Sequence, residues 1–445
     1  MNDSQRLERA ARFIGKRADL NHRPLVSNDL KGIAQVVVIP VLAEEKNLAH
    51  TLESLGRNPA DERERTLVIC VVNNRSEPHA RRDQIEDNQR TLGLLDHLVH
   101  GRSVPGHAHV TPGRLRLAYV DASSLGLEIG QKMGVGEGRR IGLDHGLRVL
   151  FDNGLARAPL MCLDADTLVS ENYLSEVRKH LSAPDAWAAA VAYEHPLPQE
   201  PAQRAAILRY ELFLRYHELA LRWAASPYAF PTIGSTIVTR SDAYVASGGM
   251  NRRQAGEDFY FLQQLAKTGG ISRINTTKVF PSSRSSDRVP FGTGASVGRY
   301  IGCEAEGYAV YNTESFRVLG EWLAVVRDGL ELSADDLLQR AEAIHQELRE
   351  FLSERDFETV WPRLQRNASK SENLEAQFHR WFDGFKTLKL VHHLRDTVFP
   401  QQPIFSAVRE ILEYLELGCN SILWEDLHQD LDSQLQLLQF VRSVT

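Results

Sequence analysis

Two acidic motifs in the sequence have the residue types and neighbours that catalytic or cation-binding carboxylates need. Asp164 and Asp166 directly follow the apolar run LMCL, and the carboxyl end of a buried strand is where open α/β sheets bind ligands. Carboxylate oxygens suit a hard divalent cation, which can offset the charge of a departing diphosphate. The alternative for this pair is an ordinary strand-to-helix turn, in which an aspartate caps the next helix.

The second motif is Gly256-Glu257-Asp258, which opens an apolar helix. A carboxylate at the mouth of a cleft can act as a general base that removes a proton from an attacking hydroxyl group. Acidic residues also favour helix amino termini because the helix dipole stabilises them there. The pair alone therefore leaves catalysis and simple helix stabilisation both open.

A glycine-rich segment, residues 130–142, lies between the apolar runs 115–121 and 160–169 and carries Lys132, Arg139 and Arg140. It contains GxGxG, but no strand runs directly into it, as a dinucleotide-binding fingerprint requires. We expect the three cations to face phosphates near the start of a helix. A flexible connection with solvated charges is the alternative.

A turn-rich loop, residues 281–298, follows the second acidic motif and carries Arg284 and Arg288. Its Ser, Gly and Arg content is typical of a lid that closes over phosphates and excludes water. An ordinary surface loop of this length is the alternative.

The elements that must position these residues alternate between strand and helix. Apolar, β-branched runs separated by helical spacing predict a mostly parallel sheet flanked by helices; they span 34–42, 66–72, 115–121 and 160–169. Further helices are expected at 204–225, 256–270 and 333–355. We predict an amino-terminal arm or helix (1–30), an α/β domain (31–304) and an α-helical carboxy-terminal domain (305–445).

Composition excludes several classes of protein. The 445 residues are 42% hydrophobic and 25% charged, with a net charge of −6, which argues against a disordered or collagen-like chain and against broad nucleic-acid binding. The cysteines are far apart, without zinc-ligand spacing; they are Cys70, Cys162, Cys303 and Cys419. The charged start MNDSQRLERAARF lacks a signal-peptide core, and no apolar run approaches the roughly 20 residues of a membrane span. We therefore expect a cytoplasmic protein without a transmembrane segment.

The motifs taken together, in order, resemble the family 2 glycosyltransferases of the GT-A fold. The matching segments are VVVIPVLAEEKNLAHTLESL, VVNNRS, the Gly-Arg-rich segment, LDADTLVSENYL and GSTIVTRSDAYVASGGMNRRQAGEDFYFLQQL. The resemblance covers residues 33–300 and not the helical carboxy-terminal part.

The resemblance implies roles for individual residues. Pro40, Glu44 and the pair Asn73-Asn74 match positions that line the nucleoside pocket of the donor. Asp164 and Asp166 match the DxD motif that binds Mn²⁺ or Mg²⁺. Asp258, with Glu257 beside it, matches the catalytic base of inverting members. The implied activity is transfer of a sugar from a nucleotide sugar, with a UDP-sugar favoured, to an acceptor hydroxyl; the acceptor could be a small molecule, a lipid-linked sugar or a polysaccharide.

The sequence also departs from the pattern of this family. Many relatives have aspartate at the positions of Asn73 and Asn74, and many have a metal-binding histidine in the region that here reads KVFPSSRSSDRVPFGTG. Water, the donor diphosphate or Asp287 could complete the coordination shell, or Arg284 and Arg288 could neutralise phosphate charge directly.

Three alternatives remain at this point. A retaining transferase resembling the glucosyl-phosphoglycerate and mannosylglycerate synthases shares the fold and the DxD motif. A non-catalytic sugar-nucleotide-binding or scaffold protein is the alternative outside enzymes. A nucleotidyltransferase ranks below both, because VVVIPVLAEEKN lacks a glycine-rich basic loop after the first strand.

Overall fold

The chain forms two compact units. The computed structural model describes residues 1–17, 20–104, 111, 113–251, 256–285, 292–301, 308–418, 422, 424, 427 and 430–445. One unit comprises Met1–Pro196 and Thr232–Ala295, and the other comprises Leu197–Pro231 and Ser296–Thr445. The domain boundaries expected after residues 30 and 304 stay a prediction, but the helix predicted at 204–225 belongs to the second unit.

The first unit is built on a nine-stranded sheet with the order β1-β4-β3-β2-β5-β8-β7-β9-β6. The strands predicted from the apolar runs are present as β2, β3, β4 and β5, and these four pair in parallel. Their bounds are Gln35–Val41, Thr66–Asn73, Arg116–Ala122 and Pro159–Cys162. The strand predicted at 160–169 ends already at Cys162, because Leu168–Val169 form a separate strand that pairs with β9. Every residue of β2, β3 and β5 is buried, which explains why their sequences are continuously apolar rather than alternating. The predicted α/β class, with helices flanking a parallel central sheet, is confirmed.

The remaining strands make the sheet mixed rather than uniformly parallel. β1 (Leu25–Ser27) pairs antiparallel with β4, so part of the predicted amino-terminal arm is an edge strand of the sheet. On the other side of β5, β8 pairs antiparallel with β5 and β7, β7 pairs parallel with β9, and β9 pairs antiparallel with β6. The bounds of β6 to β9 are Leu168–Val169, Ala188–Tyr193, Ile237–Arg240 and Ser272–Phe280.

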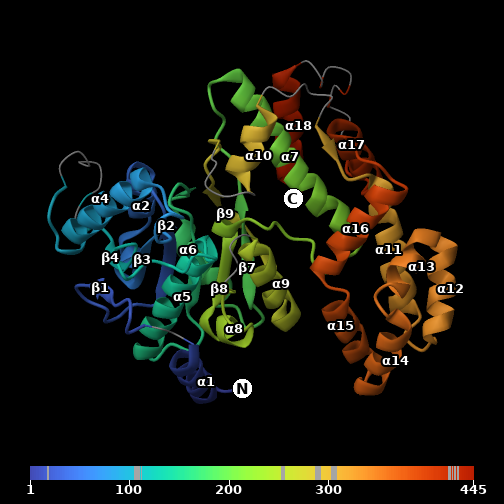
Figure 1. The fold of residues 1–445 in the computed structure, drawn as a ribbon, viewed down its shortest axis with the longest axis horizontal. Helices are drawn as coiled ribbons and strands as arrows, with labels where there is room; N and C mark the ends of the chain where they lie inside the picture. The colour runs from blue at the N-terminus through green and yellow to red at the C-terminus, as the bar shows by residue number, and fades with distance from the viewer. Residues whose placement is uncertain are drawn as a thin grey trace. The chain divides into compact units, whose positions relative to one another are not determined.

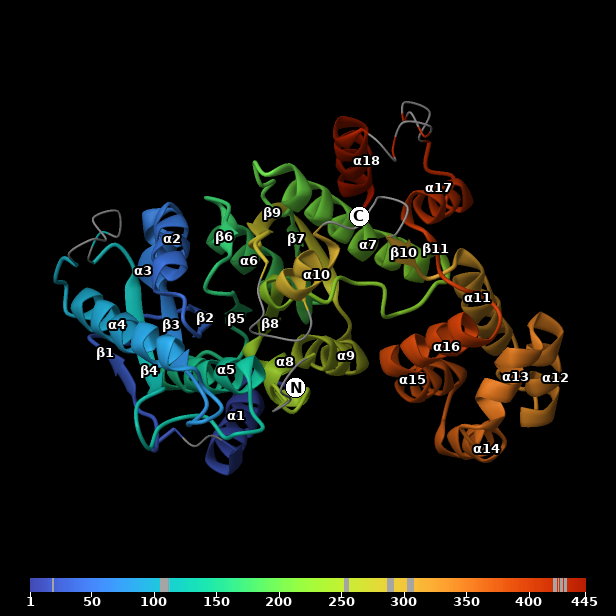
Figure 2. The same ribbon diagram turned by 45° about the horizontal axis from the view of Figure 1, so that its top comes forward.

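The direction of chain winding reverses after β4, so that β2 has β3 on one side and β5 on the other. From β2 the chain moves to β3 and β4, and then returns through α5 to β5 on the other side of β2. Right-handed connections place the helices of the two halves on opposite faces, and ligands bind where the halves diverge. Figures 1 and 2 show α4 and α5 beside these strands. The helices are α2 (Glu45–Gly56), α3 (Ala60–Arg65), α4 (Arg82–Val99), α5 (Val135–Asp152) and α6 (Tyr173–Leu181).

Glycines let α5 lie unusually close to the sheet. A β-carbon on Gly142 would come within 2.3 Å of Val38 Cγ1, and one on Gly138 within 2.8 Å of Asn73 Nδ2. Much of the glycine-rich segment is therefore the sheet-facing side of a helix and not a loop around phosphates. The close approach brings the first turns of α5 near the carboxyl ends of β2 and β3.

The amino-terminal helix α1 (Asp3–Arg17) packs on this unit. The ring of Phe13 meets that of Tyr244 edge to face at 5.7 Å, and Arg6 forms an ion pair with Asp242. Tyr244 and Asp242 belong to α8 (Ser241–Ala246), which follows the short 3-10 helix η1 (Gly234–Thr236) and β8. The helix α9 (Glu257–Gly269) then begins at the second acidic motif.

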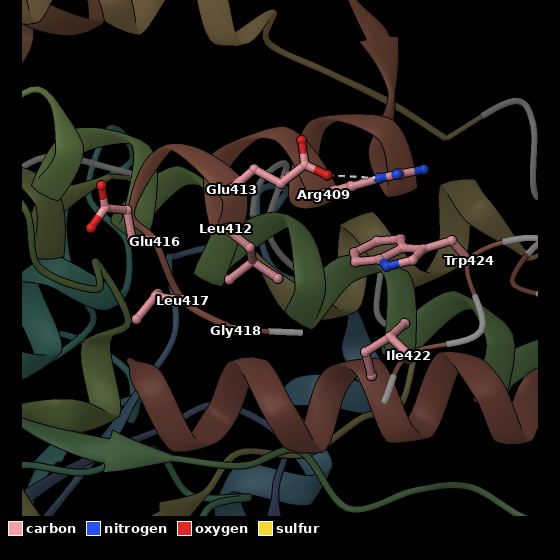
Figure 3. A pocket seen from close by; sticks show the side chains of 8 residues that line it. All are labelled: Arg409, Leu412, Glu413, Glu416, Leu417, Gly418, Ile422 and Trp424. Carbon is pink, nitrogen blue, oxygen red and sulfur yellow. Dashed lines mark hydrogen bonds and ion pairs between the residues drawn. The ribbon is translucent and has the colours of Figure 1, made fainter. Parts of the chain in front are cut away.

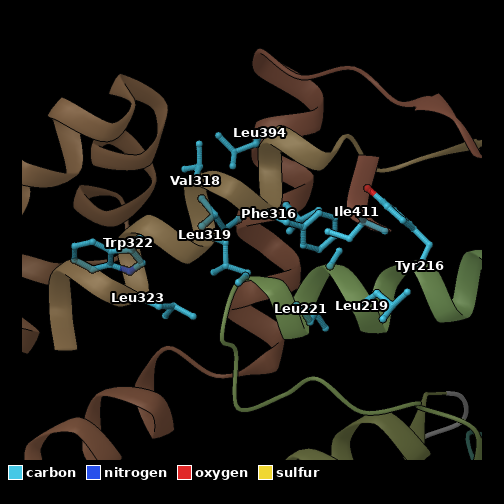
Figure 4. Packing of buried hydrophobic residues seen from close by; sticks show 14 of the residues in the cluster. Tyr216, Leu219, Leu221, Phe316, Val318, Leu319, Trp322, Leu323, Leu394 and Ile411 are labelled. Atoms are coloured by element: carbon cyan, nitrogen blue, oxygen red, sulfur yellow. The ribbon is translucent and has the colours of Figure 1, made fainter. Parts of the chain in front are cut away.

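The described residues of the second unit are mainly helical, as predicted for the carboxy-terminal region, and include the two-residue strands β10 (Ala309–Val310) and β11 (Gln402–Pro403). Figure 4 shows side chains of α7 and α11 packed together, where Tyr216 and Phe316 meet edge to face at 6.0 Å between ring centres. The helices that form this unit are α7 (Pro201–Trp223), α11 (Thr313–Asp328), α12 (Ala334–Ile344), α13 (Gln346–Ser353), α14 (Phe357–Asn367), α15 (Ser371–Trp381), α16 (Gly384–Thr397), α17 (Ile404–Tyr414) and α18 (Leu431–Val444). The helix α10 (Thr293–Tyr300) crosses the sequence boundary between the units.

One further prediction, the helix at 333–355, can be compared with the structure. The single helix expected at 333–355 is two helices, because the backbone of His345 is extended and its side chain caps α13. Cys70 and Cys162 are completely buried, and burial raises the pKa of each thiol to about 12. In the part of the chain that the structure describes, no helix is long and apolar enough to cross a membrane.

Candidate functional site

Arg139 joins the two acidic motifs of the sequence. It lies in the second turn of α5, and its guanidinium group forms ion pairs with Asp164, just after β5, and with Glu257, the first residue of α9. The side chains of Arg139 and Glu257 are nearly inaccessible to solvent, whereas that of Asp164 is 31% exposed. Burial by itself lowers the pKa of Arg139, but the charges of Asp164 and Glu257 raise it above its ordinary value. The DxD and Glu-Asp motifs therefore lie on two sides of one buried cation.

Gly234 leaves room for that cation. A β-carbon at this position would lie 2.2–2.6 Å from the three terminal atoms of the Arg139 guanidinium group, which is closer than any non-bonded contact allows. The backbone of η1 thus packs directly against the guanidinium group. The Nε atom of Arg139 is buried and has no hydrogen-bond partner among the described residues.

Arg284 forms a second bridge between carboxylates. Its Nη2 atom contacts Glu44 and lies 2.8 Å from an oxygen of Asp166, and its Nε atom lies 3.2 Å from the same oxygen. The side chain of Arg284 is 37% exposed, whereas that of Glu44 is almost buried. Glu44 was expected from the resemblance to contact the nucleoside, so its ion pair beside the DxD motif is an addition to that prediction.

Asp258 is the more accessible member of the Glu-Asp pair. It is half-buried, and one of its carboxylate oxygens accepts a hydrogen bond of 2.8 Å from the amide of Phe259. Burial raises the pKa of Asp258, and the positive charge of Arg139 opposes that shift. Burial likewise raises the pKa of Glu257, with the same opposing contribution from Arg139. A carboxylate with a raised pKa is a stronger base than an ordinary aspartate.

Asp166 shares this environment on the other side of the DxD motif. Burial raises its pKa, the charges of Glu44 and Asp164 add to the rise, and Arg284 opposes it. Among the described residues, Arg139 and Arg284 are thus linked by these contacts and charge interactions to five carboxylates, those of Glu44, Asp164, Asp166, Glu257 and Asp258.

The predicted nucleoside-binding residues lie at the ends of β2 and β3 and are held by the protein itself. Pro40 is buried in β2. The side-chain amide of Asn73 donates to the carbonyl groups of Val41 and Val71, both at 3.1 Å. The amide of Asn74 donates to the carbonyl groups of Arg75 and Ser123. Their donor groups are therefore engaged in shaping the loop after β3.

Asn88, which the sequence reading did not single out, connects these strand ends. It is completely buried in α4, accepts a hydrogen bond from the amide of Ala43, and donates to the backbone oxygen of Asn73 and the side-chain oxygen of Asn74. Ala43 has a positive φ of 52°, an uncommon conformation for a residue other than glycine. The available signal was a lone asparagine in the segment of helical spacing between the runs 66–72 and 115–121, which is too common to be informative.

The other two cations of the glycine-rich segment lie in different surroundings from Arg139. Arg140 is buried among Glu137 and Asp144 of its own helix, with N–O distances of 2.7 Å to each. These ion pairs satisfy its charge, so the geometry does not support the predicted role in donor binding. Lys132 is exposed in the connection before α5 and remains a candidate for contact with phosphate.

Some predicted residues lie outside the described part of the chain. Arg288 and Asp287 fall in 286–291, and the arginines at 252 and 253 precede α9 in a range that is also not described. The lid expected over 281–298 includes the first of these ranges and stays a prediction.

The carboxylate oxygens of the acidic residues are suitable ligands for a divalent cation, but they do not form a complete coordination shell. Among the described residues, no group of three or more His, Cys, Asp and Glu side chains has the geometry to hold a metal ion. Mg²⁺ is often held by only one or two carboxylates together with water and substrate phosphates. The carboxylates after β5 fit such a partial site.

The second unit contains a cavity of about 460 Å³ that none of the predicted site residues lines. Figure 3 shows Arg409 and Glu413 of α17 on one side of it, joined by an ion pair, with Trp424 and Ile422 nearby. Its lining mixes apolar and charged side chains and contains neither acidic motif, so the candidate functional site is the one in the first unit.

Comparisons with known proteins give distant structural matches. No protein-family profile and no curated protein sequence matches the chain. Among solved structures, S. aureus TarS 1–349 in complex with UDP-GlcNAc is 13% identical with a TM-score of 0.36, covering 93% of this chain and 90% of that one. The mannosyltransferase PcManGT from Pyrobaculum calidifontis, in complex with GDP-Man and Mn²⁺, is 13% identical with a TM-score of 0.35, covering 99% of this chain and 93% of that one.

Proposed function

We propose that this protein is a glycosyltransferase that moves a sugar from a nucleotide-sugar donor, with a UDP-sugar favoured, to an acceptor hydroxyl group with inversion at the anomeric carbon. The observation that supports this most is the ion-paired Arg139, whose buried guanidinium group holds Asp164 of the DxD motif and Glu257 of the Glu-Asp pair. Two acidic motifs on separate elements thus meet at the carboxyl edge of a parallel sheet, where open α/β folds bind ligands.

Asp258 is the proposed general base. Its carboxylate is half-buried and has a raised pKa, so it can take the proton of an acceptor hydroxyl as that oxygen attacks the anomeric carbon. Glu257 is proposed as a positioning residue, because its carboxylate is buried against Arg139 and fixes the start of α9. The carboxylates after β5 would hold a divalent cation, whose chemistry is to offset the charge of the departing nucleoside diphosphate.

The ends of β2 and β3 are proposed to receive the nucleoside. The buried network of Asn73, Asn74 and Asn88 holds the two strand ends in one shape. A preformed rim of this kind lowers the conformational entropy lost when a donor binds.

The test is a panel of UDP- and GDP-sugars, with Mn²⁺ and Mg²⁺, in which thermal stabilisation and donor hydrolysis are both measured. We expect one nucleotide to stabilise the protein and Asp258→Asn to lower turnover by about 10²–10⁴-fold without loss of nucleotide binding. Asp83→Asn is the matched control, because Asp83 is an exposed acid in the first turn of α4.

The possible outcomes separate the parts of the proposal. No stabilisation by any nucleotide would refute the transferase function. Nucleotide binding with unchanged turnover in Asp258→Asn would refute the assigned base and favour a different mechanism. The configuration of the released sugar, read by NMR, decides between inversion and retention.

A further inference from the structure

One nitrogen atom of Arg284 lies between two carboxylates, each of which follows a different strand. Nη2 contacts Oε1 of Glu44 and lies 2.8 Å from Oδ2 of Asp166. A single positive group therefore has oxygen atoms of two carboxylates within hydrogen-bond distance. The position of this nitrogen is a point at which one small cation could meet both oxygens after a small shift of the side chains.

The two carboxylates lie where the direction of chain winding along the sheet reverses. Glu44 follows β2 and Asp166 follows β5, and these strands are parallel neighbours. The carboxyl ends of neighbouring strands at such a reversal are where open α/β sheets bind ligands. The geometry of the fold, and not a local motif, brings these residues together.

The carboxylates are held more firmly than the arginine. The side chain of Glu44 is only 6% exposed, and its Oε2 atom accepts a hydrogen bond of 2.6 Å from Asn47. The side chain of Asp166 is 23% exposed, and that of Arg284 is 37% exposed. Arg284 also lies beyond the end of β9, outside any helix or strand. An arginine in such a position can leave without disrupting an element of the fold.

The two carboxylates suit a cation of higher charge than arginine. Arg284 pairs with both of them, and the neighbouring Asp164 is ion-paired with Arg139. Hard carboxylate oxygens are preferred ligands of Mg²⁺ and Mn²⁺, and a divalent ion neutralises both charges where arginine neutralises one.

We propose that Glu44 and Asp166 together ligate the divalent cation, and that Arg284 occupies its place until it binds. The inference rests on the proposed function in one respect, namely that oxygens of the donor diphosphate complete the coordination shell. Glu44 would thereby replace the histidine that many relatives of the family have and that the sequence lacks after the Glu-Asp pair. Arg284, once displaced, would be free to contact the diphosphate.

The experiment measures Mn²⁺ binding by the full chain without any nucleotide, from the loss of the electron paramagnetic resonance signal of free Mn²⁺. We expect Glu44→Gln and Asp166→Asn each to weaken binding by at least about tenfold, since even residues behind metal ligands contribute that much. Arg284→Gln should tighten binding, because it removes the competing cation.

Glu45→Gln is the matched control, because Glu45 is the next residue, is also ion-paired to an arginine, and faces Arg90 instead. It should bind Mn²⁺ like the unaltered protein. Each variant is first checked for an unchanged melting temperature, and Glu44→Asp, which keeps the carboxylate, should retain measurable binding if Glu44→Gln loses it.

Unchanged Mn²⁺ affinity in Glu44→Gln, or weakened affinity in Arg284→Gln, would overturn the inference. A repeat of the titration with UDP and GDP separates the two proposals. If Mn²⁺ binding depends on Glu44 but neither nucleotide tightens it, the proposed function is contradicted and the assignment of the metal ligands is supported. If a nucleotide binds but Mn²⁺ affinity does not depend on Glu44, the assignment of the metal ligands is contradicted and the proposed function is supported.

Discussion

Two arginines of the first unit each bridge a pair of carboxylates, yet they differ in nearly every physical respect. Arg139 lies inside a helix, is nearly inaccessible, and joins α5, the end of β5 and the start of α9. Arg284 lies outside the regular elements, is 37% exposed, and joins the residues after β2 and β5. When a buried ion pair loses one partner, the remaining charge is left uncompensated. When an exposed pair loses one partner, water solvates the remaining charge. The comparison indicates a structural cation on one side of the DxD motif and an exchangeable one on the other.

The largest expected difference is in stability. Arg139→Met should lower the free energy of unfolding by about 3–5 kcal/mol, because it leaves Glu257 and Asp164 without their buried partner. Arg284→Met should cost less than Arg139→Met, because Asp166 stays partly exposed to water after the loss of the arginine, although Glu44 is almost buried. Urea denaturation of both variants checks this, and equal losses would contradict the distinction between the two arginines.

A smaller effect is expected from the contact behind Arg139. Gly234→Ala should destabilise by about 1–3 kcal/mol, since its β-carbon would overlap the guanidinium group. Gly130→Ala is the control, because the nearest atom to its added β-carbon is 3.4 Å away, on Met133.

The double variant sharpens this test. With Arg139→Met already present, Gly234→Ala should cost much less than it does alone, because the overlapping group has been removed. Additive losses in urea denaturation would show that the glycine is needed for another reason.

The smallest expected effect is a shift in pH dependence. Burial raises the pKa of Asp258 and the charge of Arg139 opposes that rise, so the protonated, inactive form should persist above the ordinary aspartate value of about 4. Donor turnover, measured as kcat/KM, should fall as the pH is lowered through that raised value.

Arg139 and Arg284 should affect the pH dependence of kcat/KM differently. Arg139→Gln should move its midpoint to higher pH, because it removes the charge that holds the pKa of Asp258 down, whereas Arg284→Gln should leave the midpoint in place. Arg139→Lys is the control for the shift, because it keeps the positive charge. If the midpoint of the pH dependence moved as far in Arg284→Gln as in Arg139→Gln, the result would contradict the conclusion that Arg139, and not Arg284, holds the pKa of Asp258 down.

Local patterns predicted the elements of the first unit well. The apolar runs became β2 to β5, and Gly256 became the residue before α9, as the acidic start of that helix indicates. Buried strands and helix ends depend on neighbours within a few residues, and the sequence displays those neighbours directly. The antiparallel pairings of β8 with β5 and β7, and of β9 with β6, were not predicted, because pairing between distant strands leaves little local signal.

The glycine-rich segment shows the limit of the same reasoning. Its glycines indicated a loop around phosphates, but Gly138 and Gly142 face the sheet from inside α5. Whether a glycine permits a turn or a close approach of two elements depends on what lies opposite, and residues 73 and 38 lie far away in sequence.

The sequence by itself determined which acidic residues stand at the ends of strands and helices, because strand and helix boundaries arise from local periodicity and capping. Only the tertiary structure decided which cation meets which carboxylate. Arg139 and Glu257 are 118 positions apart, and Arg284 and Glu44 are 240 apart. Charges of either sign are present throughout the chain, so their partners are selected by the winding of the sheet and by burial, neither of which a one-dimensional pattern records.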